Sequence, residues 1–355
     1  MTTKMETTER QEYTTDGKVT HYSKDEEIND KLGRIIGENF IKYRKDWNEI
    51  HKLEKVSDFP LFLQIHPNQT CNYKCPHCLI GQKQIKKEYV DSGINWDTYK
   101  KIILEGEEYD CPSISIQGWN EPLLMKDLEE YISYASKHGF IDIMLNSNGS
   151  LLTEERARKI LDSGLTRIRF SLDAITKETY KKVRLSDEYD KVVNSILRFI
   201  ELRDSGGYQL PVVGVSFCKI ATNQHEVEPF MQYWDKIVDL VSIQTFMPPV
   251  QNSVFNGFYA SDQKNGNENI PSIFKCPQPF ERVDIHNSAI FPCCYYSNSK
   301  MKIGDLENDT IYQAWNSKKA KSIRHIMQKG EYWRIKTCKD CVSTTFSSEY
   351  EVEGR

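Results

Sequence analysis

Cys71, Cys75 and Cys78 are the residues of this chain whose spacing points most directly to chemistry. They form a C-x3-C-x2-C run within eight residues of sequence. Three thiolates on one tight loop can hold three corners of a cubane iron–sulfur cluster. Such a set leaves the fourth iron without a protein ligand, and an open metal position is where a substrate or cofactor binds. The spacing alone also fits a zinc loop, or three cysteines that share a distant fourth ligand.

A second group of cysteines lies late in the chain. Cys276 stands alone, Cys293 and Cys294 are adjacent, and Cys338 and Cys341 form a C-x2-C pair. Four thiolates suffice for a closed four-cysteine site, which holds zinc or a [4Fe–4S] cluster. Without further context, zinc is the favoured metal.

The composition favours an intracellular protein. The 355 residues carry 47 basic and 51 acidic side chains, a net charge of −4. No apolar run reaches the length of about 18 residues that a transmembrane helix needs, and the polar N-terminus lacks the apolar stretch of a signal peptide. We therefore predict a cytoplasmic protein with neither nucleic acid nor a membrane as partner. In a reducing compartment, its ten cysteines are expected to serve metal or redox chemistry rather than disulfides.

The elements that must position these cysteines alternate between strand and helix. Short β-rich runs occupy 61–65, 113–116, 142–146, 167–172, 212–217 and 241–246, and helical patterns occupy 97–108, 126–138, 153–163, 178–203 and 226–237. This alternation predicts an α/β fold, a parallel sheet covered by helices. A partial α/β barrel and a doubly wound open sheet both remain possible topologies. In either, the first cysteine group follows the first strand, at the edge where such folds bind ligands.

Composition shifts divide the chain into five parts. Residues 1–56 read as a polar tail and an amphipathic helix, and 57–249 as the α/β body. The Asn- and Gly-rich stretch 250–270 predicts a linker or lid. Residues 271–345 form a small cysteine-bearing unit with one predicted helix near 310–328, and 346–355 form a C-terminal tail.

The C-x3-C-x2-C run resembles the signature of the radical S-adenosylmethionine (SAM) superfamily. In that family an aromatic residue precedes the last cysteine, and His77 fills the position here. The resemblance implies a [4Fe–4S] cluster on Cys71, Cys75 and Cys78, with SAM chelating the open iron. It also implies a partial (β/α)6 barrel, so that 57–249 would be the radical SAM core.

Further motifs follow the later predicted strands. The run at 118–124 stands where the family carries a GGEP-type turn, with a Trp-Asn pair where the family has glycines. The run at 147–149 resembles the family's TNG turn, and 171–173, followed by Arg184, resembles its S-x-D…R elements. The resemblance implies SAM binding by Gly118, Asn120, Glu121, Ser147, Asn148, Ser171, Asp173 and Arg184.

The late segment resembles the SPASM/twitch extension of radical SAM enzymes. It carries a CP-x-PF run at 276–280, an adjacent cysteine pair, an IGD run at 303–305 and a C-x2-C pair. The resemblance replaces zinc by one auxiliary [4Fe–4S] cluster. Ser288 stands where the family's glycine precedes its cysteine, and this register favours Cys293, with Cys294 as the alternative. The implied ligands are Cys276, Cys293, Cys338 and Cys341.

The resemblance implies a reaction as well. SAM is cleaved reductively, and the resulting 5′-deoxyadenosyl radical abstracts hydrogen from a substrate C–H. The outcome would be oxidation or epimerisation by an oxidoreductase or epimerase supplied with electrons by a flavodoxin- or ferredoxin-type donor. The short N-terminal part favours a sugar- or cyclitol-like substrate over a ribosomal peptide, which stays the alternative. A more remote possibility is a non-catalytic iron–sulfur or zinc protein.

Cys218 is the one cysteine outside both groups for which we advance a functional hypothesis. It follows the predicted strand 212–217, and strand ends in such folds face the active site. A thiol there can quench a substrate carbon radical from the opposite face and so invert a stereocentre. Packing in the core is the alternative role.

Overall fold

The central feature of the structure, a computed structural model, is one curved mixed sheet. Its strand order is β1-β2-β8-β7-β6-β5-β4-β3-β9-β10-β11. The structure describes residues 12–13, 19–22, 25–82, 93–248, 253–261, 270–294 and 298–346.

The strands of the barrel pair in parallel and in chain order. They are β3 (Phe62–His66), β4 (Ser113–Ser115), β5 (Asp142–Ser147), β6 (Arg167–Ser171), β7 (Val212–Lys219) and β8 (Leu240–Thr245). A doubly wound sheet would reverse its strand order part-way, and this sheet does not. The partial-barrel prediction is therefore confirmed.

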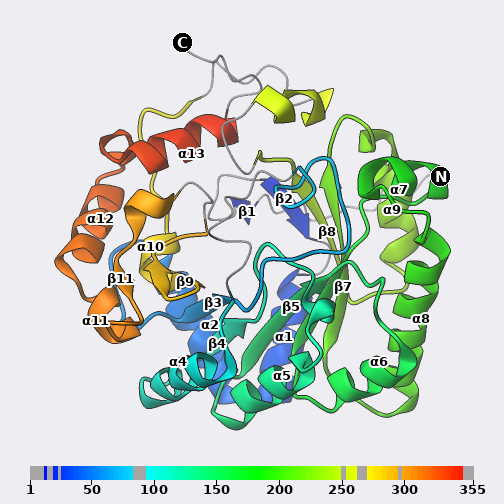
Figure 1. Ribbon diagram of the computed structural model, residues 1–355, viewed down its shortest axis with the longest axis horizontal. Helices are drawn as coiled ribbons and strands as arrows, with labels where there is room; N and C mark the ends of the chain where they lie inside the picture. Colours follow the sequence, from blue (N-terminus) through cyan, green and yellow to red (C-terminus); the bar gives the residue numbers. More distant parts are fainter. Residues whose placement is uncertain are drawn as a thin grey trace, which may run out of the picture.

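Helices cover the outer face of this sheet (Figure 1). They are α4 (Trp96–Glu108), α5 (Leu128–Lys137), α6 (Glu154–Leu161), α7 (Lys177–Arg184), α8 (Tyr189–Ser205) and α9 (Val227–Trp234). The Thr153 and Thr176 hydroxyls cap the first turns of α6 and α7, because each accepts a backbone N–H there. The single helix predicted over 178–203 is in fact two, because Leu185 adopts a left-handed conformation with φ of 50°.

Alternation along each strand separates an apolar outer face from a polar inner one. On β6, Ile168 and Phe170 enter the core beneath the helices. Arg167, Arg169 and Ser171 point the opposite way, because successive side chains of a strand face opposite sides. The inside of the barrel is therefore lined by polar side chains.

The amino-terminal ends of the strands are closed by α1 (Asp25–Ile36) and α2 (Glu38–Ile50). Sequence predicted one amphipathic helix here, but Gly37, with φ of 93°, separates two. Their apolar residues pack on residues at the starts of several strands, in a cluster of Ile28, Leu32, Phe40, Tyr43 and Val212. These two helices leave the carboxyl-terminal end of the barrel open.

Part of the predicted N-terminal tail joins the sheet. Residues Glu12–Tyr13 form β1 and Val19–Tyr22 form β2, which pairs antiparallel with β8. A polar segment can form an edge strand because backbone groups make the ladder. The tail prediction is thus wrong for these residues, and the rest of 1–23 lies outside the described residues.

Asp239 ties α1, α8 and β7 together at the closed end. Its carboxylate pairs with Lys31 at 2.8 Å and with Arg203, and it accepts the Val213 N–H at 2.9 Å. Burial alone would raise the pKa of the Asp239 carboxyl group. The hydrogen bonds from Lys31 and Val213 and the charge of Arg203 together outweigh burial, so the pKa lies below its usual value.

We expect Asp239→Ala to lower the free energy of unfolding by about 3 kcal/mol at pH 7, because Arg203 loses its buried partner. An acid with a lowered folded-state pKa contributes stability above its unfolded-state pKa of about 3.9, and this is lost as the pH falls through the folded-state value. Urea unfolding should therefore show that the difference in free energy of unfolding between wild type and variant is smaller near pH 3 than at pH 7. Glu155→Ala is the control, because Glu155 forms an exposed pair with Lys159, and it should change the free energy of unfolding little. Equal losses in both variants would contradict the prediction.

The late cysteine-bearing segment extends the same sheet. Its strand β9 (Arg282–His286) pairs in parallel with β3, followed by antiparallel β10 (Ala289–Phe291) and β11 (Gly304–Asp305). Its helices are α10 (Gln278–Glu281), α11 (Ile311–Trp315), α12 (Lys318–Gln328) and α13 (Lys336–Phe346). The one helix predicted near 310–328 is thus split in two. The segment places its cysteines beside the barrel.

The stretch predicted as a linker or lid is packed where it is described. Residues Ser253–Phe258 form a 3-10 helix, and Phe255 and Tyr259 are buried. Their rings lie 6.4 and 5.7 Å from that of Phe246, just beyond β8. Residues 250–252 and 262–269 lie outside the described residues.

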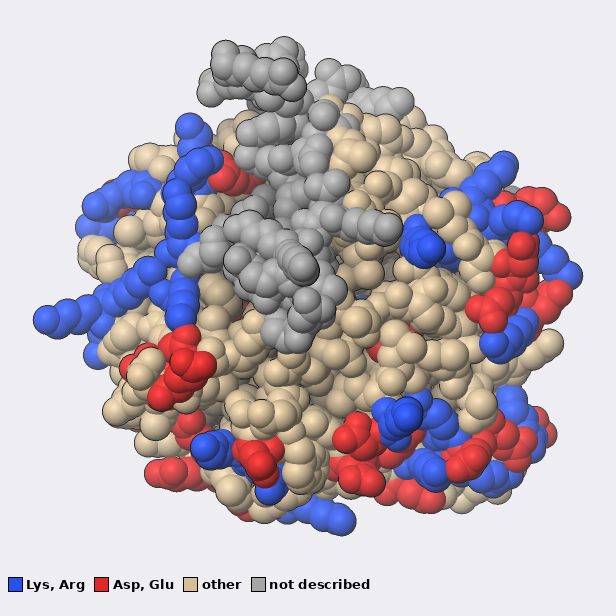
Figure 2. Space-filling view, viewed as in Figure 1, with Lys and Arg blue, Asp and Glu red and all other residues tan. Residues whose placement is uncertain are grey.

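The surface is consistent with the modest net charge. On the face shown in Figure 2, Lys, Arg, Asp and Glu gather toward the rim over the helices. No helix in the described ranges is both long and apolar enough to cross a membrane.

Candidate functional site

The first cysteine group lies on the loop after β3, at the open end of the barrel. Cys75 is buried, and Cys71 and Cys78 are partly exposed. The Tyr73 N–H lies 3.4 Å from the Cys71 sulfur. Burial raises the pKa of Cys71 to about 12, and the neighbouring Cys75 and Cys78 also raise it. Because thiolates are the metal-binding form, a metal that binds here must displace protons from this set.

A buried ion pair stands directly behind Cys75. The Arg184 guanidinium lies 2.8 Å from an Asp173 oxygen and 3.6 Å from the Cys75 sulfur. Burial alone raises the pKa of Asp173, but the Arg184 charge and His77 lower it overall. Asp173, with φ of 60°, also accepts the Cys218 N–H at 2.7 Å. The two partners thus link the cysteine loop to the ends of β6 and β7.

Glu121 joins the turns that follow β4 and β5. One carboxylate oxygen accepts the Ser147 hydroxyl at 2.6 Å, and the other accepts the Asn148 N–H at 2.7 Å. The Asn148 amide in turn donates to Asn72 and lies 4.0 Å from the Cys71 sulfur. Glu121 therefore positions Ser147 and Asn148 against the cysteine loop.

Gly118 and Asn120 hold the loop after β4 against the segment before Cys71. The Asn120 carbonyl accepts the Gly118 N–H at 2.9 Å, and its amide donates to Asn68 at 3.1 Å. A Cβ on Gly118 would lie 1.7 Å from the His66 ring nitrogen Nδ1. Only glycine fits at this position, because the imidazole occupies the space of a side chain. Ser171, the last residue of β6, lies 3.4 Å from Ser216 of β7, oxygen to oxygen.

The late cysteines form a second group. Burial raises the pKa of Cys276, and Cys341, Cys293 and Cys338 raise it further, which places the four thiols within electrostatic reach of one another. Cys294 has a different environment: its N–H donates to the Gln278 carbonyl at 3.0 Å. Its sulfur lies 3.5 Å from the amide nitrogen of the same glutamine. The choice of Cys293 rather than Cys294 as the fourth ligand stays a prediction from the sequence.

This difference gives a prediction for a matched pair of variants. Cys293→Ala should remove about four irons and four acid-labile sulfides per chain, because a closed four-cysteine site loses a ligand. Cys294→Ala should retain the iron and the sulfide, since the N–H and the sulfur of Cys294 both face the Gln278 side chain. Iron and sulfide analysis after anaerobic reconstitution measures both. Loss of a cluster in the Cys294 variant with retention in the Cys293 variant would reverse the assignment.

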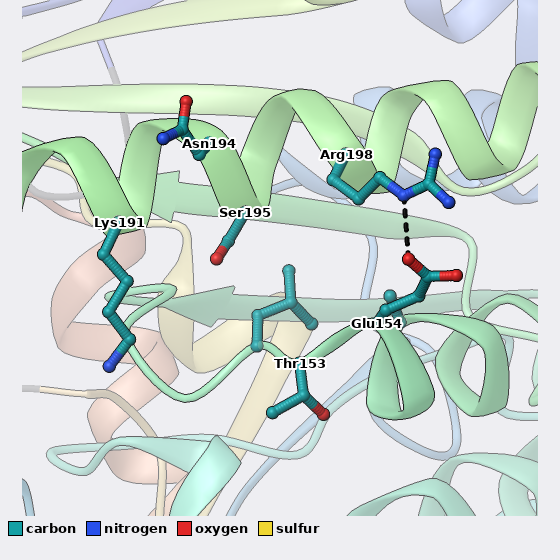
Figure 3. A pocket seen from close by; sticks show the side chains of 8 residues that line it. Thr153, Glu154, Lys191, Asn194, Ser195 and Arg198 are labelled. Carbon is teal, nitrogen blue, oxygen red and sulfur yellow. Dashed lines mark hydrogen bonds and ion pairs between the residues drawn. The ribbon is translucent and has the colours of Figure 1, made fainter.

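A separate surface pocket lies between α6 and α8 (Figure 3). The Glu154 carboxylate pairs there with Arg198 at 2.9 Å, and Lys191, Asn194 and Ser195 of α8 complete much of the wall. This pocket includes neither cysteine group, and its acid already has a partner. It contributes no residue to the site at the open end of the barrel.

Comparison with known families identifies the two regions of the chain that carry the cysteine groups. Residues 65–214 match the model of the radical SAM superfamily, and residues 276–342 match the SPASM model, an iron–sulfur cluster-binding domain. The chain contains a radical SAM domain followed by a SPASM domain. These domains imply a SAM-binding [4Fe–4S] cluster, SAM itself and an auxiliary iron–sulfur cluster. The geometry fits such clusters: Arg184 and Asn148 direct N–H groups toward the Cys75 and Cys71 sulfurs, and hydrogen bonds to cluster sulfurs tune the reduction potential of a cluster.

Curated relatives cover about half of the chain. A probable GTP 3′,8-cyclase of Methanococcus maripaludis is 33% identical over 178 residues, which are 50% of this chain and 56% of the relative. A protein of the same name from Methanocaldococcus jannaschii is 30% identical over 192 residues, 52% and 59% of the two chains. The match therefore spans a little over half the length of these relatives.

Solved structures resemble the chain over most of its length. BtrN in complex with AdoMet and 2-DOIA superposes with a TM-score of 0.53 at 17% identity, over 83% of this chain and 98% of BtrN. Streptococcus suis SuiB bound to the precursor peptide SuiA gives a TM-score of 0.59 at 12% identity, over 87% and 80%. At these identities the likeness shows the fold.

Sequence reasoning missed the polar side chains of the inner barrel face. Arg169 and Asn146 point inward from β6 and β5 and lie 3.1 Å apart, nitrogen to oxygen. The available signal was the alternation in Arg167–Ser171, where polar residues break an otherwise apolar strand. It also missed His66 on β3 and Asp284 on β9, which meet although they are far apart in the chain.

Proposed function

We propose that this chain is an enzyme that removes a hydrogen atom from an unactivated C–H of a small polar molecule, sugar- or cyclitol-like, held inside the barrel. The observation that carries the proposal is the polar inner face beneath the Cys71–Cys78 loop. When bound there, the cluster and SAM supply a 5′-deoxyadenosyl radical. The protein's own part is to bind the substrate, orient one C–H toward the loop and exclude water.

Arg169 is a charged group of this inner face. Its guanidinium reaches Asn146 of β5 at 3.1 Å and Ser242 of β8 at 3.4 Å. The Arg169 side chain passes beside Gly214 of β7. A Cβ added to Gly214 would lie 3.7 Å from the Arg169 side chain and 3.1 Å from the Leu240 carbonyl oxygen. Within the described residues, the hydrogen-bond partners of Arg169 (Asn146 and Ser242) are neutral, so its charge is available to an electronegative substrate group. Hydroxyl, carboxylate and phosphate oxygens all meet that requirement.

A row of hydroxyls continues this polar surface. Ser171, Ser216 and Ser242 lie opposite one another on three neighbouring strands. Hydroxyl groups donate and accept hydrogen bonds, which suits a polyhydroxylated substrate. Such a surface is poorly suited to the apolar side chains of a peptide, and this favours a sugar- or cyclitol-like substrate.

Cys218 follows Ser216 on the same inward-facing side of β7. Its N–H is held by Asp173, the partner of Arg184 behind Cys75. We therefore propose Cys218 as the hydrogen-atom donor. Its S–H bond breaks as a C–H bond forms on the substrate radical, and the sulfur regains hydrogen from one proton and one electron of a flavodoxin- or ferredoxin-type donor. Delivery opposite to the abstraction face inverts the carbon, whereas oxidation would not require this thiol.

One set of assays tests the proposal. The reconstituted enzyme, SAM and dithionite are incubated in D2O with sugars and aminocyclitols, with GTP, or with a cysteine-bearing peptide, and 5′-deoxyadenosine is measured. We expect substrate-dependent 5′-deoxyadenosine with the sugar class only. Stimulation by peptide or GTP alone would transfer the proposal to a peptide maturase or a nucleotide cyclase. No 5′-deoxyadenosine from any compound would reject hydrogen abstraction.

The role of Cys218 has its own readout. Thiol hydrogen exchanges with solvent, so an epimerised product formed in D2O should carry one deuterium at the inverted carbon. Cys218→Ala should stop epimerisation while 5′-deoxyadenosine still forms. Full turnover by this variant, or an oxidised product without deuterium, would remove the donor role and leave oxidation as the reaction.

A further inference from the structure

Three metal-ligating side chains meet inside the barrel, away from both cysteine groups. His66 on β3 lies opposite His286 on β9 in the parallel ladder. Asp284 precedes His286 by two residues and therefore projects from the same side of β9. All three side chains are at most 2% exposed. The pairing of the SPASM strand with the first barrel strand creates this cluster.

Their potential ligand atoms converge. The His66 Nε2 atom lies 2.8 Å from Asp284 Oδ1, and His286 Nε2 contacts the same oxygen. The two imidazole rings are stacked, with centroids 3.8 Å apart and planes inclined by 26°. One ligand atom from each residue lies within 4.8 Å of the others. Ligands bonded to one metal at about 2.0–2.1 Å stand about 3 Å apart, close to the 2.8 Å between His66 Nε2 and Asp284 Oδ1.

Hydrogen bonding accounts poorly for the arrangement. Within the described part of the chain, neither oxygen of Asp284 nor either ring nitrogen of His66 makes a hydrogen bond of acceptable direction. A buried carboxylate and a buried imidazole left in that state are costly. A cation between them satisfies the carboxylate charge and the imidazole lone pairs together.

We propose that His66, Asp284 and His286 bind one divalent transition-metal ion, Zn²⁺ or Fe²⁺. Two imidazoles and one carboxylate are the ligand set that both ions accept, and three protein ligands leave a position open. The ion would stand between the SAM loop, which follows β3, and the auxiliary-cluster segment. A substrate oxygen or a water molecule would fill the open coordination position of the ion.

The surroundings fit a metal site. Trp119 packs edge-on against both His66 and His286, with ring centroids 5.1 and 4.7 Å apart, and Phe291 lies beside His286. Such an apolar shell limits water around a site and strengthens metal–ligand electrostatics. Gly118 leaves the space that the His66 ring fills. The chain thus fixes the orientation of the ring from two sides.

The test separates this ion from cluster iron. The full-length chain is purified anaerobically from medium containing iron and zinc, and metals and acid-labile sulfide are measured. A [4Fe–4S] cluster holds equal iron and sulfide, so iron in excess of sulfide, or zinc, reports other sites. We expect about one such ion per chain. After the chain is loaded with one equivalent of Zn²⁺, X-ray absorption at the zinc edge should show nitrogen and oxygen neighbours near 2.0–2.1 Å and no sulfur near 2.3 Å.

Variants locate the ion. Asp284→Asn and His286→Gln should each lower the extra metal at least fivefold while sulfide stays constant. His225→Gln, at an exposed histidine, is the matched control and should retain it. The wild-type absorption spectrum decides the case even if the variants fold poorly. Sulfur neighbours, or wild-type chain without extra metal after incubation with equimolar Zn²⁺, would overturn the proposal and leave a His–Asp–His contact.

Discussion

Cys75→Ala is expected to reduce 5′-deoxyadenosine formation to background and to lower iron from about eight to about four per chain, the content of one [4Fe–4S] cluster. Cys75 is the most buried cysteine of its loop, and the Arg184 guanidinium lies 3.6 Å from its sulfur. The loop has no other thiol that can replace it, since Cys71 and Cys78 are predicted to bind the same cluster. Losing one of three ligands should therefore release the cluster. Iron, sulfide and 5′-deoxyadenosine are measured on the same preparation.

Cys111→Ala provides the matched control. Cys111 is also buried in the early part of the barrel, but its sulfur faces the Ser113 carbonyl at 3.7 Å. Its removal should leave iron content and SAM cleavage unchanged. If this variant also lost four irons, Cys111 would be a fourth ligand and the open iron position would have to be abandoned. Full iron content and SAM cleavage in Cys75→Ala would contradict the prediction more directly.

The barrel was predictable because its strands are short apolar runs at regular spacing. The predicted runs 142–146 and 167–172, for example, correspond to β5 and β6 within one residue at each end. Ends of parallel strands meet at one edge, so their order also placed the runs at 147–149 and 171–173 near the cysteine loop. Local pattern and global fold agree here, and sequence reasoning then succeeds.

Features that depend on pairing between distant segments could not be predicted. Nothing in the sequence of β9 indicates that it will lie beside β3, so the meeting of His66 with Asp284 was invisible. The polar segment Val19–Tyr22 is a strand only because β8 offers it an edge. Helix breaks at Gly37 and Leu185 depend on single backbone conformations that periodicity does not report. Tertiary context decides each of these cases.

Arg184→Met should produce the largest loss of stability. Arg184 and Asp173 are both buried, and removing one partner leaves the other charge uncompensated, at a cost of about 3–5 kcal/mol. The pH dependence of the protein's stability should also reverse. In the wild type Arg184 and His77 hold the pKa of Asp173 low, so its contribution is lost as the pH falls through that value. In the variant we expect burial to outweigh His77 and to raise this pKa, so that stability is lost as the pH rises through it.

The double variant Arg184→Met/Asp173→Asn isolates the charge effect. It removes both buried charges and keeps a residue that tolerates the φ of 60° at position 173. We expect it to recover a large part of the lost stability and to lose the reversed pH dependence, because no lone charge remains. Thermal unfolding of the cluster-loaded chain under anaerobic conditions, at pH values from 5 to 8, compares the three proteins. Equal destabilisation of the single and double variants at every pH would show that Arg184 acts through packing, and the electrostatic link between Asp173 and Cys75 would then have to be given up.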